Sequence, residues 1–229
     1  MISVVIPTLN AEEGLSACLS ALVPAAVEGL VREVIVVDGG SSDRTLKIIE
    51  QSGAEVVHSA PGRGEQLSVG AAQARQPWLL FLHADTVLET GWDRDVYALI
   101  ERVDSGRREA TAAAFRFTLD DQGFWPRMIE FGVAVRCALF RMPYGDQGLL
   151  IPRSLYQRVG GYSRLPLMED VDLARRIGRR RIMVLRSRAV TSAVRYRRDG
   201  YFRRSARNLS CLTLFFLRVP PRVIARLYG

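Results

Sequence analysis

Residues 78–86 read W-L-L-F-L-H-A-D-T, and the fold prediction starts from this stretch. Its five leading apolar residues do not alternate with polar ones, which is typical of a strand buried on both faces of a sheet. His83 and Asp85 follow where such a strand reaches the edge of the sheet, and ligands bind there in open α/β sheets. Because they are two positions apart on an extended chain, the two side chains point to the same side, where they could bind a metal ion or a metal-bound phosphate. The structural alternative makes Asp85 a cap and His83 a hydrogen-bonded edge residue.

Three further short apolar runs precede this stretch and alternate with helical patterns. They predict strands at residues 4–6, 34–37 and 54–58, and the intervening segments, including residues 65–74, predict helices. Asn10 and Glu13 have the spacing of an N-cap and its capping-box partner. The β-α alternation over the first ninety or so residues predicts a parallel sheet with helices on both faces.

The pattern changes after Thr86, where strands and helices no longer alternate regularly. Helical patterns lie at residues 92–103, 124–142 and 168–176, and strand patterns at residues 112–119, 149–151 and 182–185. Residues 201–229 combine arginines with leucine and phenylalanine, which predicts a basic helical tail.

Composition and charge limit the classes of protein. The chain has 229 residues, a net charge of +8 and a sequence pI of about 10.0, so phosphate groups, nucleic acid or an anionic membrane surface are its expected partners. The three cysteines are scattered and show no metal-ligand spacing, so we expect buried, reduced thiols at Cys18, Cys137 and Cys211. With no leader pattern and no apolar stretch of about 20 residues, the sequence predicts a cytoplasmic protein.

Polar residues at the ends of the first two predicted strands indicate a nucleotide site. If these strands are neighbours, Pro7 and Thr8 lie beside Asp38, whose carboxylate can accept from a ribose hydroxyl or a base N–H. Neither G-x-G-x-x-G nor a Walker loop is present, so a dinucleotide fingerprint is excluded. Asp38 could instead only form the turn. Arg63, between two glycines, could reach a diphosphate or be a solvated surface arginine.

Glu169 and Asp170, at the start of a predicted helix, are the best candidates for catalysis. A carboxylate beside a sugar hydroxyl can act as a general base. The alternative is that both acids only complement the helix dipole. The Gly145-Asp146-Gln147 segment is placed on the acceptor side of the cleft, with a plain turn as the alternative.

The order of these motifs resembles that of family 2 inverting glycosyltransferases with the GT-A fold. The motifs are P-T-L-N-A-E, V-V-D-G-G-S-S-D, L-F-L-H-A-D-T, G-G-Y and M-E-D-V-D-L-A-R-R-I, and the resemblance covers residues 2–180. It implies an α/β fold with a Rossmann-like, mostly parallel central sheet and helices on both faces. The expected organisation is a transferase domain at residues 1–195, with nucleotide-binding (1–90) and acceptor-binding (91–195) halves, followed by a basic tail at residues 196–229.

The resemblance also implies a donor site. The residues implied to hold the nucleoside of a UDP- or GDP-linked sugar are Pro7, Thr8, Glu12 and Asp38. Arg63 is implied to lie near the donor's base or phosphates, and Asp85 to bind a divalent metal, Mn²⁺ or Mg²⁺. His83 stands where the family's D-x-D element has its first carboxylate, and imidazole suits Mn²⁺ better than Mg²⁺. The L-H-A-D-T form is similar to that of a branch of small bacterial transferases.

The implied reaction is a single displacement with inversion, in which Asp170 of the E-D element, next to Glu169, deprotonates the acceptor hydroxyl. The acceptor is open, either lipid-linked or soluble. Residues 124–142 and the tail are interpreted as interfacial helices on the inner face of a membrane, as cover helices, or as a homodimer interface. The alternatives to a glycosyltransferase are a nucleotidyltransferase using residues 62–64 as a phosphate loop, and a non-enzymatic module binding membrane or nucleic acid; with a transferase, no nucleic acid is expected.

Overall fold

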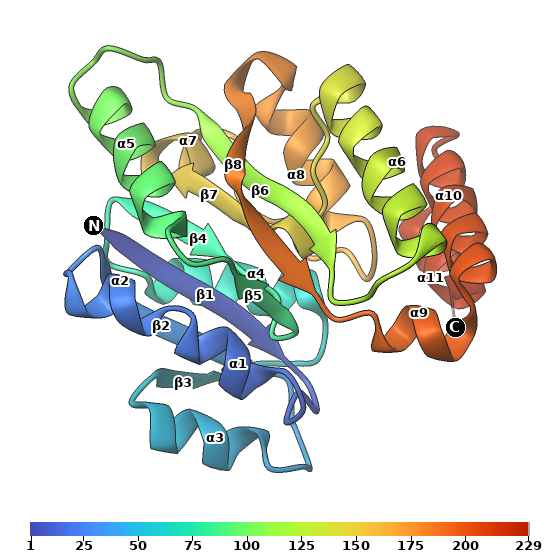
Figure 1. The fold of residues 1–229 in the computed structure, drawn as a ribbon, viewed down its shortest axis with the longest axis horizontal. Coiled ribbons are helices and arrows are strands. Elements are labelled where there is room, and N and C mark those ends of the chain that lie inside the picture. The colour runs from blue at the N-terminus through green and yellow to red at the C-terminus, as the bar shows by residue number, and fades with distance from the viewer. Residues whose placement is uncertain (229) are drawn as a thin grey trace.

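The structure is a computed structural model that describes residues 1–228, and it is built on one sheet (Figure 1). The sheet has eight strands in the order β3-β2-β1-β4-β7-β6-β8-β5. Its strands are β1 (Ile2–Thr8), β2 (Val31–Asp38), β3 (Glu55–His58), β4 (Trp78–Phe81), β5 (Thr86–Leu88), β6 (Ala112–Leu119), β7 (Leu149–Pro152) and β8 (Ile182–Thr191). Gly229, the last residue of the predicted tail, lies outside the described residues.

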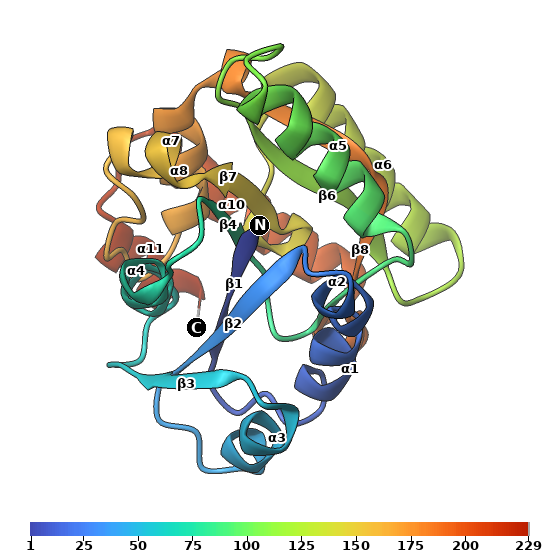
Figure 2. The ribbon, with the colours of Figure 1, turned by 90° about the vertical axis from the view of Figure 1, so that its left-hand side faces the viewer.

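The first half of the sheet is parallel, as predicted. β1 pairs in parallel with both β2 and β4, and β3 extends the sheet beyond β2. The connecting helices are α1 (Leu15–Ser20), α2 (Val23–Val27), α3 (Thr45–Ser52) and α4 (Arg63–Gln73). α1 and α2 cover one face of these strands, and α4 covers the other (Figure 2). α4 approaches β1 and β2 closely because Gly70 has no side chain, and a Cβ there would lie 2.4 Å from Val5 Cγ1.

The second half of the sheet is mixed. β7 runs antiparallel to β4 and β6, β6 and β8 are parallel, and β5 is antiparallel to β8. Its helices are α5 (Trp92–Asp104), α6 (Phe124–Phe140), α7 (Arg153–Arg158) and α8 (Glu169–Ile177), with short 3₁₀ turns η1 (Gly145–Gln147) and η2 (Arg179–Arg181). Three helices end the chain: α9 (Val194–Asp199), α10 (Tyr201–Phe216) and α11 (Pro221–Tyr228).

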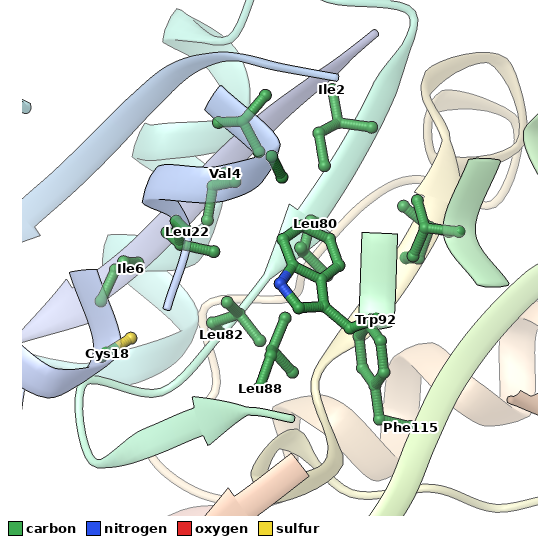
Figure 3. Close-up of a cluster of buried hydrophobic side chains, with 14 of the residues drawn as sticks. Ile2, Val4, Ile6, Cys18, Leu22, Leu80, Leu82, Leu88, Trp92 and Phe115 are labelled. Atoms are coloured by element: carbon green, nitrogen blue, oxygen red, sulfur yellow. The ribbon is translucent and has the colours of Figure 1, made fainter. Parts of the chain in front are cut away.

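Alternate residues of the central strands supply the cores on the two faces of the sheet. Val4 and Leu80 belong to the core that contains Trp92 and Phe115 (Figure 3), whereas Val5 belongs to the core on the other face. Since both faces are covered, all four residues of β4 are buried. The absence of alternation in residues 78–82 is therefore explained, and the prediction of a doubly buried strand is confirmed.

Three local predictions differ from the structure. The strand from residue 78 stops at Phe81, because the chain turns at His83–Asp85 before β5 pairs elsewhere. The predicted cap at Asn10 is wrong: α1 begins at Leu15, and the side-chain Oδ1 of Asn10 accepts from the Ser42 N–H (2.9 Å). β8 continues six residues past the predicted end at residue 185, since it pairs with both β6 and β5.

The described part of the chain also shows where the cysteines lie and how long and apolar the helices are. All three cysteines are free and buried, as predicted. Within residues 1–228, no helix combines the length and the apolar character needed to cross a bilayer.

Candidate active site

A cavity of about 140 Å³ lies beyond the end of β4, between η1, α8 and α10. Five of the predicted site residues line it: Arg63, His83, Asp85, Glu169 and Asp170. Larger hollows of about 470 Å³ and 660 Å³ lie elsewhere, the first against α1, α2 and α3 and the second between α6 and the strands β6 and β8. Neither of these hollows is lined by a histidine, and the carboxylate in each is paired with an arginine. The smallest of the three cavities is therefore the one that contains the candidate catalytic and metal-binding residues.

A second cluster surrounds Asp38, at the ends of β1 and β2. The two strands pair in register up to Thr8 and Asp38, so these residues are neighbours as predicted. One carboxylate oxygen of Asp38 accepts from the N–H groups of Gly40 and Ser41 (both 2.9 Å), and the other from the hydroxyls of Ser41 (2.5 Å) and Thr8 (3.3 Å). Burial opposes ionisation, but the bonds from Ser41, Gly40 and Thr8 outweigh it and lower the pKa of Asp38.

The neighbouring loop is held by Glu12. Its carboxylate accepts from the backbone N–H (3.0 Å) and the side chain (3.1 Å) of Arg44, and these bonds lower the pKa of Glu12. Pro7 is half-buried on β1 and pairs with Val37. Pro7, Thr8, Glu12 and Asp38 therefore lie together at one edge of the sheet, but they do not line the 140 Å³ cavity.

The turn after β4 carries His83 and Asp85. It packs against the start of α1, where a Cβ on Gly14 would lie 2.9 Å from the Ala84 carbonyl oxygen. Among the described residues, no group hydrogen-bonds to the buried Nε2 of His83. Burial, followed by the positive charges of Arg63 and Arg195, holds the pKa of His83 well below its ordinary value. A lowered pKa favours the neutral imidazole, which is the form that can bind a cation.

Glu169 and Asp170 begin α8, directly after Met168, whose φ of 66° is unusual for a residue other than glycine. Glu169 is almost fully buried and lies 3.4 Å from the guanidinium of Arg63. Burial and the charge of Asp170 raise the pKa of Glu169 despite this partner. One oxygen of Asp170 accepts from the Gly145 N–H (2.8 Å), and the other accepts from the N–H of Val171 (2.7 Å).

η1 connects the turn that carries His83 with the acids of α8. Gly145 lies against His83, since a Cβ there would be 2.5 Å from Nε2. Oδ1 of Asp146 is buried without a hydrogen-bond partner among the described residues. Burial raises the pKa of Asp146 to about 6; Asp170 and Asp85 add to this effect and Arg136 opposes it. η1 thus belongs to the cavity, which agrees with placing this segment in the cleft.

The side chains of the cavity suit a cation that binds together with a diphosphate better than they suit a metal ion held by the protein alone. Within residues 1–228, no three histidine, cysteine, aspartate or glutamate residues are gathered to hold a metal ion. The cavity does present Asp85 and the neutral imidazole of His83. Mg²⁺ is commonly bound through one or two protein carboxylates, with substrate phosphates completing its coordination.

Several residues of the site were not identified from the sequence. Gln66 of α4 donates to the carbonyl oxygens of both Thr8 and Val37 (2.7 Å each), and so ties the ends of β1 and β2 to α4. The cavity is also lined by Tyr144, Arg195, Tyr196, Arg204 and Asn208. The last three come from the predicted tail. No motif of fixed spacing marks them there, and Arg204 is one of many arginines in that segment.

Comparison with known proteins assigns the family. The model of the family described as glycosyl transferase family 2 matches residues 3–167. An uncharacterized glycosyltransferase of Mycobacterium tuberculosis is 35% identical over 106 residues, covering 46% of this chain and 44% of that protein. A PGL/p-HBAD biosynthesis glycosyltransferase of the same organism is 36% identical over 101 residues, covering 38% and 36%. The chain thus spans less than half the length of these curated relatives.

Solved structures show the same fold. Staphylococcus aureus TarS 1–349 in complex with UDP-GlcNAc superimposes with a TM-score of 0.63 at 19% identity, covering 83% of this chain and 58% of that one. Glucosyl-3-phosphoglycerate synthase from M. tuberculosis, with Mn²⁺, UDP-Glc and phosphoglyceric acid, gives a TM-score of 0.56 at 25% identity, covering 80% and 68%. With its GT-A fold and a family match over most of its length, the chain belongs to glycosyl transferase family 2.

Proposed function

We propose that this chain transfers a sugar from a nucleoside-diphosphate sugar to an acceptor hydroxyl, with inversion at the anomeric carbon. One observation carries the proposal: Asp170 is held by the Gly145 N–H in the same cavity as Asp85, His83 and Arg63. One small cavity is therefore lined by a proton acceptor (Asp170), a candidate cation site (Asp85 and His83) and a positively charged side chain that can bind phosphate (Arg63).

Asp170 is the proposed general base. Its bond to Gly145 orients the carboxylate, which can then take the proton of an acceptor hydroxyl. Glu169, which is paired with Arg63 and has a raised pKa, is a positioning residue in this proposal. A single base acting on an acceptor hydroxyl is the arrangement required for one displacement with inversion.

The donor is proposed to extend from the Asp38 cluster to the cavity. Thr8, Glu12 and Asp38, next to Pro7, bind the nucleoside in this proposal, and Arg63 binds the diphosphate. A divalent cation, Mn²⁺ or Mg²⁺, held by Asp85 and His83, would neutralise charge on the diphosphate. The solved relatives that contain UDP-GlcNAc, or Mn²⁺ with UDP-Glc, support a UDP-linked donor. Three free, buried cysteines support action in a reducing compartment such as the cytoplasm.

A thermal-shift panel tests the donor class. UDP- and GDP-linked sugars and nucleoside triphosphates are added to the purified chain with and without Mn²⁺. We expect one nucleotide-sugar to raise the melting temperature by several degrees, with a larger shift when Mn²⁺ is present. Asp38→Asn should weaken this shift, whereas the control Asp93→Asn on α5 should retain it. Stabilisation by a triphosphate with release of pyrophosphate would instead support a nucleotidyltransferase.

A further inference from the structure

α10 packs against both α6 and α11 along one side of the molecule (Figure 1). These three helices expose many large apolar residues. Single exposed apolar residues are common on proteins, but this many on adjacent helices indicate an interaction surface. We call this set the α6–α10–α11 face. Its apolar members are Phe124, Trp125, Met128, Phe131, Val135, Leu139, Phe140, Phe202, Leu209, Phe216, Leu217, Val223 and Leu227.

Helical spacing places these side chains on the outer side of each helix. On α6, Phe124, Met128, Phe131, Val135 and Leu139 recur every three or four residues and form one stripe. The buried residues of α6, Pro126, Val133 and Cys137, lie on the opposite side of the helix. α6 is thus apolar on both sides, which is a property of helices that are covered on both sides.

α10 repeats this arrangement. Phe202, Leu209 and Phe216 recur every seven residues and form its outer stripe, opposite the buried Arg204 and Cys211. Phe131 and Phe202 are 66% and 76% exposed, so neither stripe is covered within the chain itself. α10 is a neighbour of both α6 and α11, and each helix has a buried inner side, so their outer stripes lie on adjacent helices.

The charge of this region selects an anionic partner. Residues 200–229 contain six arginines and no aspartate or glutamate. Two of the arginines pair with Asp199, whereas Arg203, Arg218, Arg222 and Arg226 are exposed. A second copy of the chain would be a poor partner, because a two-fold dimer places this face, with its arginines, against itself. Apolar stripes flanked by arginines are typical of helices that lie in the headgroup region of an anionic membrane.

We propose that the α6–α10–α11 face docks on an anionic lipid surface, with its apolar stripes entering the headgroup region and its exposed arginines binding lipid phosphates. The cavity adjoins this region, since Arg204 and Asn208 of α10 line it. Docking would therefore hold the cavity close to the bilayer, where a lipid-borne acceptor could reach it. The docking itself is independent of the proposed transferase chemistry.

Vesicle co-sedimentation of the full chain tests this proposal. Phosphatidylcholine vesicles with one-third phosphatidylglycerol should bind the chain, pure phosphatidylcholine vesicles should bind it weakly, and added salt should release it. Phe131→Ser combined with Phe216→Ser should lower binding roughly tenfold or more. The control Tyr97→Ser removes an aromatic residue of α5 that is about as exposed as Phe131 (62% against 66%), and it should leave binding unchanged. All of these residues are exposed, so the variants should keep the parent melting temperature.

A second pair of variants separates local docking from the attraction of total charge. Arg222→Gln with Arg226→Gln should reduce binding to the anionic vesicles roughly tenfold. Arg94→Gln with Arg102→Gln, on the distant α5, changes the net charge equally and should have little effect (Figure 1). Equal losses from both pairs would overturn the proposal. The proposal would also be overturned if the chain did not bind vesicles but sedimented as a dimer, and if Phe131→Ser dissociated that dimer.

Discussion

The carboxylate of Asp38 at the end of β2 has its hydrogen bonds satisfied within the chain, whereas two buried polar atoms at and beside η1 have no partner among the described residues. Asp38 accepts four hydrogen bonds, and its pKa is lowered. Asp146 Oδ1 and His83 Nε2 are buried without partners in the described chain, and both pKa values shift toward the neutral forms. The first cluster is ordered before a ligand arrives; the second leaves atoms that a ligand or cation can satisfy.

This difference separates a carboxylate that the chain itself orders from buried groups that are left open to a ligand. Asp38, which accepts four hydrogen bonds and has a lowered pKa, is a weak base and a rigid anchor, which suits recognition of a nucleoside. A carboxylate held by few bonds in a buried cavity has a higher proton affinity and is available to a substrate. The comparison predicts different consequences for substitutions in the two clusters.

Asp170→Asn should have the largest effect. Asparagine keeps an oxygen that can accept from Gly145, but it cannot take a proton, so kcat should fall by roughly 10²- to 10⁴-fold. Donor binding in the thermal-shift assay should be nearly unchanged. The matched control is Asp172→Asn, two residues along α8, whose carboxylate binds Arg176 and Ser163 outside the cavity. Unchanged turnover in Asp170→Asn would remove this residue from the role of base.

Asp38→Asn should mainly reduce stability. In the variant, the amide N–H group points at hydrogen-bond donors from which the carboxylate of the parent accepts. We therefore expect the free energy of unfolding to fall by about 2 kcal/mol, or roughly 4–8 °C in melting temperature. Because the folded-state pKa is lowered, the carboxylate stabilises the protein above its unfolded pKa of about 3.9, and this contribution is lost as the pH falls through the folded value. The difference from the parent should therefore be largest near neutral pH and shrink below about pH 4.

Gly145→Ala tests the link between His83 and Asp170. The added Cβ would lie 2.5 Å from His83 Nε2, so η1 must shift and move the N–H that holds Asp170. We expect kcat to fall roughly tenfold to a hundredfold with a smaller change in donor binding. Gly132→Ala in α6 is the control, because its Cβ meets open space; it should be as active as the parent and up to about 1 kcal/mol more stable. Equal activity of both variants would show that η1 does not position the base.

Asp146→Asn should have the smallest effect, with a pH dependence opposite to that of Asp38. A raised folded-state pKa of about 6 gives stability that is present below the unfolded pKa of about 3.9 and is lost as the pH rises through 6. The variant stays neutral, so its melting temperature should rise relative to the parent between pH 4 and pH 7, on the order of 1 kcal/mol after screening by water in the cleft. Unfolding with a chelator present measures this difference; no change with pH would mean that Asp146 is fully solvated.

Much of the fold followed from local patterns. The runs at residues 4–6, 34–37 and 78–82 have no alternation because both faces of their strands are covered, and that property is visible in the sequence. The ordered motifs also predicted the family correctly. Helix starts were less predictable: the side chain of Asn10 had a distant partner, Ser42, that competed with the predicted cap.

The site divides in the same way. Local patterns predicted candidates at strand ends and helix starts, namely Asp38, His83, Asp85, Glu169 and Asp170, and the last four line the cavity. It could not show that Gly145 holds Asp170 across 25 positions of sequence, or that Arg63 pairs with Glu169 across 106. Such contacts depend on how β7 and α8 pack against β4, and no short-range pattern records that packing.

The sequence by itself determined the parallel half of the sheet, its doubly buried central strands and the acids at their ends, because these depend on residue type and short-range period. Only the tertiary structure decided which carboxylates are satisfied and which are left without partners, since that depends on groups brought together from β1, β4, η1 and α8. It also brought the arginine-rich C-terminal helices beside the cavity and left their apolar stripes outward. Burial and hydrogen bonding are properties of the assembled chain, and they separate the fully bonded Asp38 from the unpaired atoms of Asp146 and His83.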